Sequence, residues 1–421
     1  MPLAERFHGT RVLQGPAAAR PIATEDYSTI GAIVVAPNAD PVKYPLNVAT
    51  TIFTGDNVAV AALGAGGNVD AVIDAINDQA DAEFGSAEVQ IVRVAEGAGA
   101  NAQAILEATI ANIVGSGATL SGVHAFKVPE KKAKLYIAPG YTSQRIANAA
   151  NPVVSELIGI TGRNRGITIA DMPNTTKEAA ATYRADFADG KRIYGIDPHV
   201  LVSGAGGTPV VQPASGRVAG LFVRRDKKEG GPHVSPSNQQ IGGIVGTARP
   251  VPYYMGDPDS EANWLNQNNI ATIRRGGRLW GNDTFALDPL YRYVNVVRTE
   301  DAIDDAVAKA FEWAMDANVN VPLAVAIVRS LDAFLTDAAV RGWIISGKVT
   351  FDPAANSNAN MVAGQLTIDY DREPYAPLND LQFRASRNPD YYTYVTDGIT
   401  RAVEQINAKT RRLIYGVNLG A

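Results

Sequence analysis

The stretch GAGGNVDAVIDAINDQ at residues 64–79, followed by VQIVRV at 89–94, decides the class of fold. The Gly-rich start predicts a tight turn, and after it Val69, Ile73 and Ile76 recur at the spacing of one helix face. The second run is mostly apolar, which is typical of a buried strand. A turn, a helix and a strand in this order indicate an α/β protein.

The same alternation extends in both directions along the chain. IGAIVVA (30–36) predicts a buried strand and NVATTIF (47–53) a second one. Further along, helical and strand-like runs alternate, which favours a largely parallel or mixed sheet with helices on both faces. The predicted helices cover 101–114, about 144–158 and 176–190, and the predicted strands cover 134–140, 166–173 and 194–202.

The pattern changes after residue 203. Residues 203–216 are rich in Gly, Pro and Ser and predict a break, with a short helix at 217–226 after it. Gly276 and Gly277 stand between apolar flanks and predict a β-hairpin. The remaining predicted elements are helices at 300–316 and 322–341, strands at 349–352, 365–371 and 380–386, and an amphipathic stretch at 399–416.

Composition excludes several classes of function. A net charge of -5 argues against a protein that grips nucleic acid or an anionic membrane through its overall charge. The chain has no cysteine, which excludes disulfides, thiolate nucleophiles and Cys-based zinc sites. No apolar run approaches the roughly 20 residues of a membrane helix, and the first residues lack an apolar signal core. We therefore expect a globular protein that folds in the cytoplasm.

Motifs for bound cofactors or metals are weak. The Gly-rich turns at 64–67 and 204–207 lack both the Lys-Ser/Thr ending of a phosphate loop and the G-x-G-x-x-G spacing of a dinucleotide fold. The histidines occur singly, without a partner at i+4. We therefore expect turns or helix caps at the glycines, and neither cofactor nor metal.

One short segment fits an enzyme. Asp197 and His199 follow a predicted strand, and the carboxyl ends of parallel strands are where α/β folds usually place catalysis. A turn is the competing interpretation. A soluble α/β enzyme acting on a phosphorylated or sugar-like substrate thus stays open as the alternative function.

The stretch GPHVSPSNQQIGGIVG (231–246) predicts a stiff, shaped loop rather than a catalytic one. It has no G-x-S-x-G elbow. Prolines fix φ, Ser and Asn side chains can bond their own backbone, and glycines permit close backbone approach. The residues that carry this interpretation are Pro232, Pro236, Ser237, Asn238, Gly243 and Gly246.

Residues 226–246, with WLNQNNIATIRRGGRLWGNDT at 264–284, resemble the shared motif pair of contractile tail sheath proteins. The second motif comprises Asn266, Gly276, Gly277, Trp280 and Gly281. The likeness covers most of residues 1–395 and includes PLNVATTIF, FEWAMD and QLTIDYDREPYAPLNDLQFR. Two departures are noted: many sheaths carry an aromatic residue where this chain has Pro232 or His233, and a basic tail follows after about residue 395.

The resemblance implies a non-enzymatic structural subunit with a multi-domain α/β fold. Such subunits polymerise into a helical cylinder around a tail tube and contract from a metastable extended state, which drives the tube through the host envelope. The implied partners are further copies of the chain, the tail tube protein, and baseplate and tail terminator proteins, with no direct nucleic-acid contact and no membrane insertion. The implied place is the virion tail, assembled in the host bacterial cytoplasm. Phage tail, bacteriocin and other contractile systems stay open as contexts.

The resemblance also implies terminal arms that donate strands to neighbouring subunits, and a face that contacts the tube. Two alternatives remain for that face, one acidic and one basic. The expected divisions are an N-terminal arm (1–20), the N-terminal part of the α/β body (21–95), an outer α/β domain (96–220), a tube-facing sheath domain (221–380) and a C-terminal arm and extension (381–421). The expected arm residues are Phe7, Thr10, Val12, Leu13, Leu381, Phe383, Tyr392 and Tyr394; the candidate tube-facing residues are Glu300, Asp301, Asp304 and Asp305, or Arg401, Lys409, Arg411 and Arg412.

Overall fold

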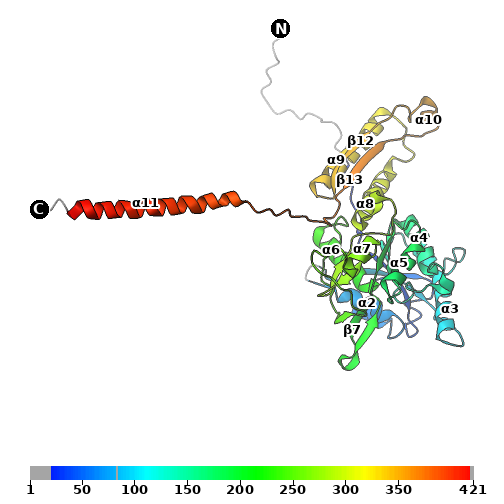
Figure 1. Cartoon of the computed structure of the whole chain (residues 1–421). Helices are drawn as coiled ribbons and strands as arrows, with labels where there is room; N and C mark the ends of the chain where they lie inside the picture. Colours follow the sequence, from blue (N-terminus) through cyan, green and yellow to red (C-terminus); the bar gives the residue numbers. More distant parts are fainter. Residues whose placement is uncertain (1–19, 82–83, 418–421) are drawn as a thin grey trace, which may run out of the picture. The chain divides into compact units, whose positions relative to one another are not determined.

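A six-stranded mixed sheet forms the centre of the protein (Figure 1). The computed structural model describes residues 20–81 and 84–417. All neighbouring strands run parallel except β2, which is antiparallel to β3, so the predicted parallel or mixed sheet is confirmed. The strands lie in the order β2 (Ala49–Phe53), β3 (Glu88–Val94), β1 (Ile30–Val35), β4 (Leu135–Ile137), β5 (Ile167–Asp171) and β6 (Ile193–Ile196).

Strand β1 is the buried centre of this sheet. Ile30 faces Val89 of β3 on one side and Leu135 of β4 on the other, and all six residues of β1 are buried. This burial explains its continuous apolar sequence, because helices cover both faces of a parallel sheet. The sheet also takes strands from both 21–95 and 96–220, so these two ranges share one core.

Four helices cover the two faces. Helices α2 and α6 pack together over one face, and Gly216 permits the close approach because a Cβ there would lie 2.2 Å from the carbonyl oxygen of Ala71. Helices α3 and α4 cover the other face with a separate apolar cluster. Their bounds are α2 (Val69–Asn77), α6 (Ser215–Glu229), α3 (Ala102–Val114) and α4 (Pro152–Asn164).

Several predicted boundaries were wrong. The helix expected at about 144–158 is α4, which begins at Pro152 because Asn151 caps it by accepting a hydrogen bond from the backbone N–H of Val154. The strand expected at 194–202 divides at Pro198, which has no N–H for a ladder, into β6 and β7 (Val200–Ser203).

The expected break at 203–216 contains a further strand. Strand β7 pairs antiparallel with β8 (Pro209–Gln212) and with the short β9 (Gly246–Thr247). Helices α5 (Lys177–Ala185) and α7 (Glu261–Gln267) pack beside β6, at one edge of the six-stranded sheet, and α1 (Asn57–Ala61) follows β2, at the opposite edge.

The region after residue 290 has an apolar core of its own, separate from those of the α/β body. Ile303, Leu331, Phe334 and Trp343 pack around Tyr27 from the N-terminal segment. The helix predicted at 300–316 runs instead from 294 to 310 and is followed by a single 3₁₀ turn. The elements are α8 (Val294–Ala310), α9 (Val321–Val340), β12 (Ile344–Thr350), α10 (Asn358–Val362) and β13 (Asp369–Pro374), with β12 and β13 antiparallel.

The described residues from 378 onward form a separate unit. Its extended segment precedes α11 (Tyr392–Val417), drawn in red in Figure 1. The strand expected at 380–386 does not form in the described chain. Tyr392 and Tyr394, expected in a strand-forming arm, lie in α11, because the helical spacing of apolar residues there outweighs the β-propensity of its Tyr and Thr residues. Among the described residues, no helix is long and apolar enough to cross a membrane.

Candidate functional site

The loop 231–246 and the hairpin β10 (Thr272–Arg274)–β11 (Arg278–Trp280) form one folded unit. The backbone N–H of Asn238 donates to Leu279 O (2.7 Å), the N–H of Leu279 donates to Gln239 O (3.0 Å), and the N–H of Ile241 donates to Gly277 O (2.9 Å). The loop thus adds to the hairpin as a third extended segment. We call this assembly the motif unit.

Side chains of both motifs hold the unit together. The Ser237 hydroxyl accepts from the N–H of Gly281 (3.0 Å), and Asn238, at φ 62°, accepts from Arg274 Nη2 (2.9 Å). Asn266 Nδ2 donates to the carbonyl of Trp280 (3.1 Å), which ties α7 to the hairpin. The remaining predicted residues serve its backbone: Pro232 and Pro236 are buried in the loop, and Gly276, Gly277 and Gly281 adopt positive φ.

One end of the loop packs against the α/β body. Gln79, at the end of α2, accepts from the N–H of Gly242 (2.9 Å) and donates to its carbonyl (3.1 Å). Gly243 has φ 70°, and a Cβ there would lie 1.9 Å from a carboxylate oxygen of Asp78. Glycine is therefore required at position 243, both by the positive φ and by the close carboxylate of Asp78. Gly246 belongs to β9 and pairs with Leu201.

The other end of the loop packs against α8 and β12. The ring of His233 stacks on Trp343 with centroids 5.7 Å apart, and its carbonyl accepts from Asn295 Nδ2 (3.1 Å). Burial lowers the pKa of His233, so the ring is neutral at pH 7. His233 is thus a packing residue. The loop connects the α/β body, through Gln79, with the apolar core after residue 290, through Trp343.

A buried ion pair joins α6 to α8. Arg298 donates from both terminal nitrogens to the Asp226 carboxylate (2.9 and 2.5 Å), and Nη2 also reaches the carbonyl of Tyr27 (3.0 Å). Only 2% of the Arg298 side chain and 5% of Asp226 is exposed. Burial raises the pKa of Asp226 to about 6, although the guanidinium opposes this shift. Sequence alone missed this pair, because nothing in it links positions 226 and 298.

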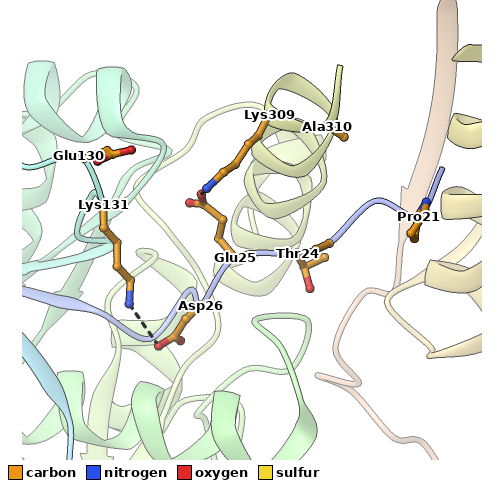
Figure 2. Close-up of a pocket in the computed structure, with 9 residues that line it drawn as sticks. Pro21, Thr24, Glu25, Asp26, Glu130, Lys131, Lys309 and Ala310 are labelled. Atoms are coloured by element: carbon orange, nitrogen blue, oxygen red, sulfur yellow. Dashed lines mark hydrogen bonds and ion pairs between the residues drawn. The ribbon is translucent and has the colours of Figure 1, made fainter. Parts of the chain in front are cut away.

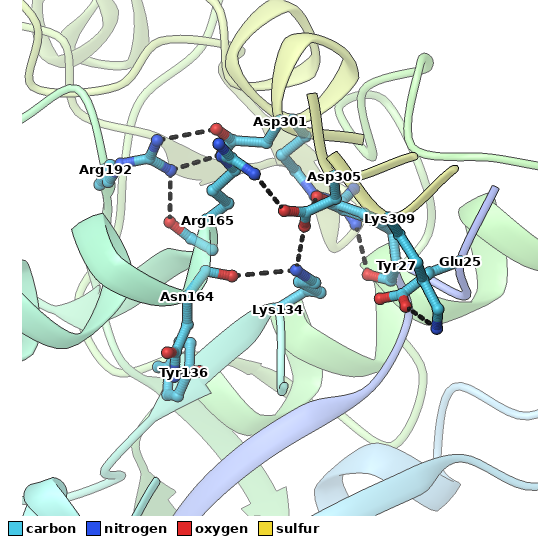
Figure 3. Close-up of polar contacts among 12 residues, drawn as sticks. Glu25, Tyr27, Lys134, Tyr136, Asn164, Arg165, Arg192, Asp301, Asp305 and Lys309 are labelled. Carbon is cyan, nitrogen blue, oxygen red and sulfur yellow. Dashed lines mark hydrogen bonds and ion pairs between the residues drawn. The ribbon is translucent and has the colours of Figure 1, made fainter. Parts of the chain in front are cut away.

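The acidic run of α8 is committed to contacts inside the subunit (Figure 3). Asp305 accepts from Lys134 Nζ (2.5 Å), from Arg165 Nη1 (2.6 Å) and from the Tyr27 hydroxyl. Burial alone would raise the pKa of Asp305, but these donors hold it below its usual value. Asp301 pairs with Arg192, with Nη2 to Oδ1 at 2.7 Å.

The acidic alternative for the tube-facing surface therefore offers little unpaired charge, and it stays a prediction. Asp301 is 5% exposed, and Asp304 accepts from the Tyr370 hydroxyl (2.6 Å) and from Arg372 (3.0 Å). Glu300 is half-buried, and burial raises its pKa. The run packs α8 against the start of β4, the α4–β5 turn and the start of β6, and it does not form a free acidic face.

A pocket of about 630 Å³ lies where the N-terminal segment enters the body (Figure 2). Lys309 pairs with Glu25 (2.7 Å), and Lys131 lies 3.8 Å from Asp26 and 2.5 Å from Glu88. Both lysines are thus neutralised by carboxylates of their surroundings. These charges fix the entering segment between α8 and the loop at 129–131.

Comparison with known proteins assigns the family. Residues 86–284 match the family model of the phage tail sheath protein central domain, and residues 287–386 match that of the phage tail sheath C-terminal domain. A putative prophage major tail sheath protein of Pseudomonas aeruginosa is 34% identical over 397 residues, covering 93% of this chain and 99% of the relative. The chain belongs to the phage tail sheath protein family. The tail sheath protein of Escherichia phage P2 is 30% identical over 393 residues, with 91% and 96% covered.

The sheath fold extends to contractile injection systems. The anti-feeding prophage helical sheath in its contracted state matches with TM-score 0.64 and 16% identity, covering 90% of this chain and 99% of that one. The sheath complex of an extracellular contractile injection system, PVC, in its contracted state matches with TM-score 0.65 and 13% identity, covering 92% and 99%. The resemblance inferred from the motifs is confirmed.

The segment that suggested an enzyme is a structural anchor in this sheath protein. Asp197 is completely buried and pairs with Arg249, which also pairs with Glu261. His199 is held by its backbone N–H, which donates to Asn174 Oδ1 (3.0 Å). No group of three or more metal-ligating side chains gathers in the parts of the chain that the structure describes.

The crevice that α/β folds use for ligands is filled by Asn68. Strands β3 and β4 follow β1 in the chain but flank it on opposite sides, so the topology reverses at β1, the usual ligand position. There the Asn68 side chain accepts from the N–H of Val35 (2.8 Å) and donates to the carbonyls of Ile33 (3.2 Å) and Pro139 (3.0 Å). The Gly-rich turn at 64–67 places this plug.

The structure describes only some of the terminal residues that were predicted to contact other molecules. Phe7, Thr10, Val12 and Leu13 lie outside the described residues. Leu381 and Phe383 are exposed, at 63% and 85%, in an extended segment, and their role in an arm stays a prediction. The basic group is on the exposed surface of α11: Arg401, Lys409, Arg411 and Arg412.

Proposed function

We propose that this sheath protein polymerises into stacked rings that form a helical cylinder around a tail tube and contracts to drive the tube through a host envelope. The observation that carries the proposal is the end-to-end match to a prophage tail sheath protein, at 93% of this chain and 99% of the relative. The further partners would be the tail tube protein and the baseplate and tail terminator proteins. The cylinder would be a component of the virion, assembled in the host cytoplasm.

Strand exchange between subunits would hold the cylinder together. Within the described chain, β12 and β13 pair only with each other, so each has an open edge. The extended segment with Leu381 and Phe383, and the N-terminal residues 1–20, supply the material for added strands. Each added backbone hydrogen bond contributes about 1 kcal/mol net, so two arms would keep subunits linked while their bodies move.

Contraction would release energy stored during assembly. A difference of a few kcal/mol per subunit between two packings is the scale of switching proteins, and it sums over the many copies of a cylinder. The motif unit and the α8 ion pairs support such a mechanism, because they tie the two cores into one body that can move as a whole.

Of the two predicted groups for tube contact, we favour the basic group of α11. The acidic run of α8 is occupied within the subunit, whereas Arg401, Lys409, Arg411 and Arg412 are exposed. We therefore keep these four residues as the proposed tube-facing charges.

Electron microscopy of the concentrated full-length protein tests the proposal. We expect hollow striated cylinders, whose helical parameters identify the extended or contracted state. Deletion of residues 1–20 should leave a folded, soluble subunit, with an unchanged circular dichroism spectrum, that forms no cylinders. Intact cylinders from this deletion would refute the N-terminal arm, and a saturable small-molecule ligand with a closed small oligomer would favour the enzyme.

A further inference from the structure

Residues 20–27, which we call the strap, lead from the first described residue toward the central strand of the body. Residues 20–26 have no secondary structure, and β1 begins at Ile30. Figure 2 shows the strap passing beside the end of α8 that carries Lys309 and Ala310. The first residues of a domain keep one path only where they are tied down, so the contacts of the strap decide what it can do.

The outer end of the strap is held by Arg20. Its backbone N–H donates to the Ser330 hydroxyl of α9 (3.0 Å), and its guanidinium carbon lies 3.9 Å from the centre of the Trp313 ring. Ser330 is only 2% exposed, so water has little access to this hydrogen bond. Ile22 adds a contact with the apolar core that also contains Leu331. This anchor therefore stands where the proposed N-terminal arm joins the described chain.

The inner end of the strap is held by Tyr27, which is 3% exposed. Its hydroxyl donates to Asp305 of α8 (Figure 3), and its carbonyl accepts from Arg298 Nη2 (3.0 Å). Lys134 Nζ lies 4.5 Å from the centre of the Tyr27 ring. This one residue contacts both groups of ion pairs on α8, and buried polar contacts of this kind are costly to break. Tyr27 is therefore the stronger of the two anchors.

The middle of the strap is held by weaker contacts. Glu25 pairs with Lys309 (2.7 Å), Asp26 lies 3.8 Å from Lys131, and the four side chains are 29–66% exposed. Exposed ion pairs contribute little to stability. Residues of this part line the pocket of about 630 Å³, so there is open space beside it. The strap is thus fixed at its two ends and has room to move between them.

We propose that the strap takes up a pull on the N-terminal arm and passes it to α8 and α9, so that the pull does not reach β1. The inference rests on the proposed function, because an arm bound to a neighbouring subunit would pull on Arg20 during contraction. Strand β1 begins three residues after Tyr27 and lies inside the six-stranded sheet, so a pull on its end would peel a core strand. Tyr27 prevents this as a positioning residue between the arm and the sheet.

Single-molecule pulling on the full-length subunit tests this load path, because the native chain has no cysteine and handles can be attached at chosen sites. On the loaded axis, DNA handles are attached at Ala4→Cys and Val211→Cys, so the pull passes through the strap. On the control axis they are attached at Val58→Cys and Val211→Cys, on exposed residues of the α/β body (70% and 50%). The readout is the lifetime of the folded chain at constant force.

On the loaded axis, Tyr27→Ala should shorten this lifetime at least about tenfold, because the pull breaks the contacts of Tyr27 before those of the sheet and forced unfolding follows the unfolding rate. On the control axis we expect a change of less than about twofold, because these contacts lie outside the path of the pull. Tyr27→Phe keeps the ring but loses the bond to Asp305, and should give a smaller change on the loaded axis alone, which keeps the test valid if Tyr27→Ala does not fold. The matched control, Tyr254→Ala, removes a 66% exposed ring and should change neither axis.

Two results would overturn the inference. Equal lifetimes of the native chain and the Tyr27 variants on the loaded axis would mean that the strap carries no load. Equal shortening on both axes would mean that Tyr27 only stabilises the fold. These measurements use single unassembled subunits, whereas electron microscopy of the same variants reports cylinder formation, so failure of the proposed function is distinguishable.

Discussion

Helices α8 and α11 both carry runs of charged residues that look alike in the sequence. In the structure, the charges of α8 are paired within the chain and those of α11 are exposed. On α8, Asp301 and Asp305 are bound by cations from three other parts of the chain. On α11, Arg401 and Arg412 are exposed. The charges of α8 form ion pairs inside the folded subunit, whereas the charges of α11 are exposed and can contact another molecule. A charge run therefore identifies a binding surface only when its partners within the chain have been excluded.

The largest expected effect comes from breaking the buried pair of α8. Arg298→Ala leaves the Asp226 carboxylate buried without its cation, which costs about 3–5 kcal/mol in the free energy of unfolding. Urea denaturation of the unassembled subunit measures it. The control is Arg341→Ala, which removes an exposed i,i+4 pair with Asp337 and should change stability by less than about 0.5 kcal/mol. Similar values for the two variants would contradict the role of α8.

The pH dependence of the same pair comes next. Because the folded-state pKa of Asp226 is about 6, above an unfolded value of about 3.9, its protonation favours the folded state. That contribution is complete below about pH 4, is lost as the pH rises to about 6, and amounts to about 3 kcal/mol. Subtracting the urea stability of Asp226→Asn from that of the native chain at each pH should show this decline. A difference independent of pH between 4 and 6 would refute it.

An effect of intermediate size on the free energy of unfolding is expected for the contacts of Asp305 on α8. Asp305→Asn removes the anion that faces Lys134, whose side chain is only 3% exposed, and we expect a loss of about 2 kcal/mol. The matched control is Asp332→Asn on the exposed side of α9. Equal unfolding free energies for these two variants would mean that the α8 run is a solvated face after all.

The smallest effect on stability is expected on α11. Replacing Arg401, Lys409, Arg411 and Arg412 together by Gln should change the unfolding free energy by less than about 0.5 kcal/mol, because these side chains are exposed. If they face the tube, co-sedimentation with tail tubes should weaken, and the difference from the native chain should shrink at high salt. A destabilised subunit would contradict the comparison, and unchanged tube binding would contradict the proposed contact.

The sequence predicted those features that depend on local periodicity and backbone chemistry. The buried run of β1, the turn into α2 and the Gly276–Gly277 hairpin were confirmed, because each depends on neighbouring residues. The glycines of the motif unit were also placed correctly, although the partner of Gly243, Asp78, could not be anticipated.

Features that depend on distant pairing escaped prediction. Arg192 and Asp301 are 109 positions apart, and Arg298 and Asp226 are 72 apart, so no local pattern connects them. The same reason explains why the partners of the acidic run on α8 were not anticipated. Tyr392 and Tyr394 were expected in a strand-forming arm because of the family resemblance, but the helical spacing of the apolar residues around them places them in α11.

The plug formed by Asn68 has a consequence for how the central strand ends. Its side chain satisfies the backbone of β1 and the carbonyl of Pro139 in the crevice where related topologies hold a metabolite. The chain therefore closes this end of β1 with an amide of its own. A polar side chain fixed in sequence, and not an added molecule, satisfies the backbone groups that end the central strand.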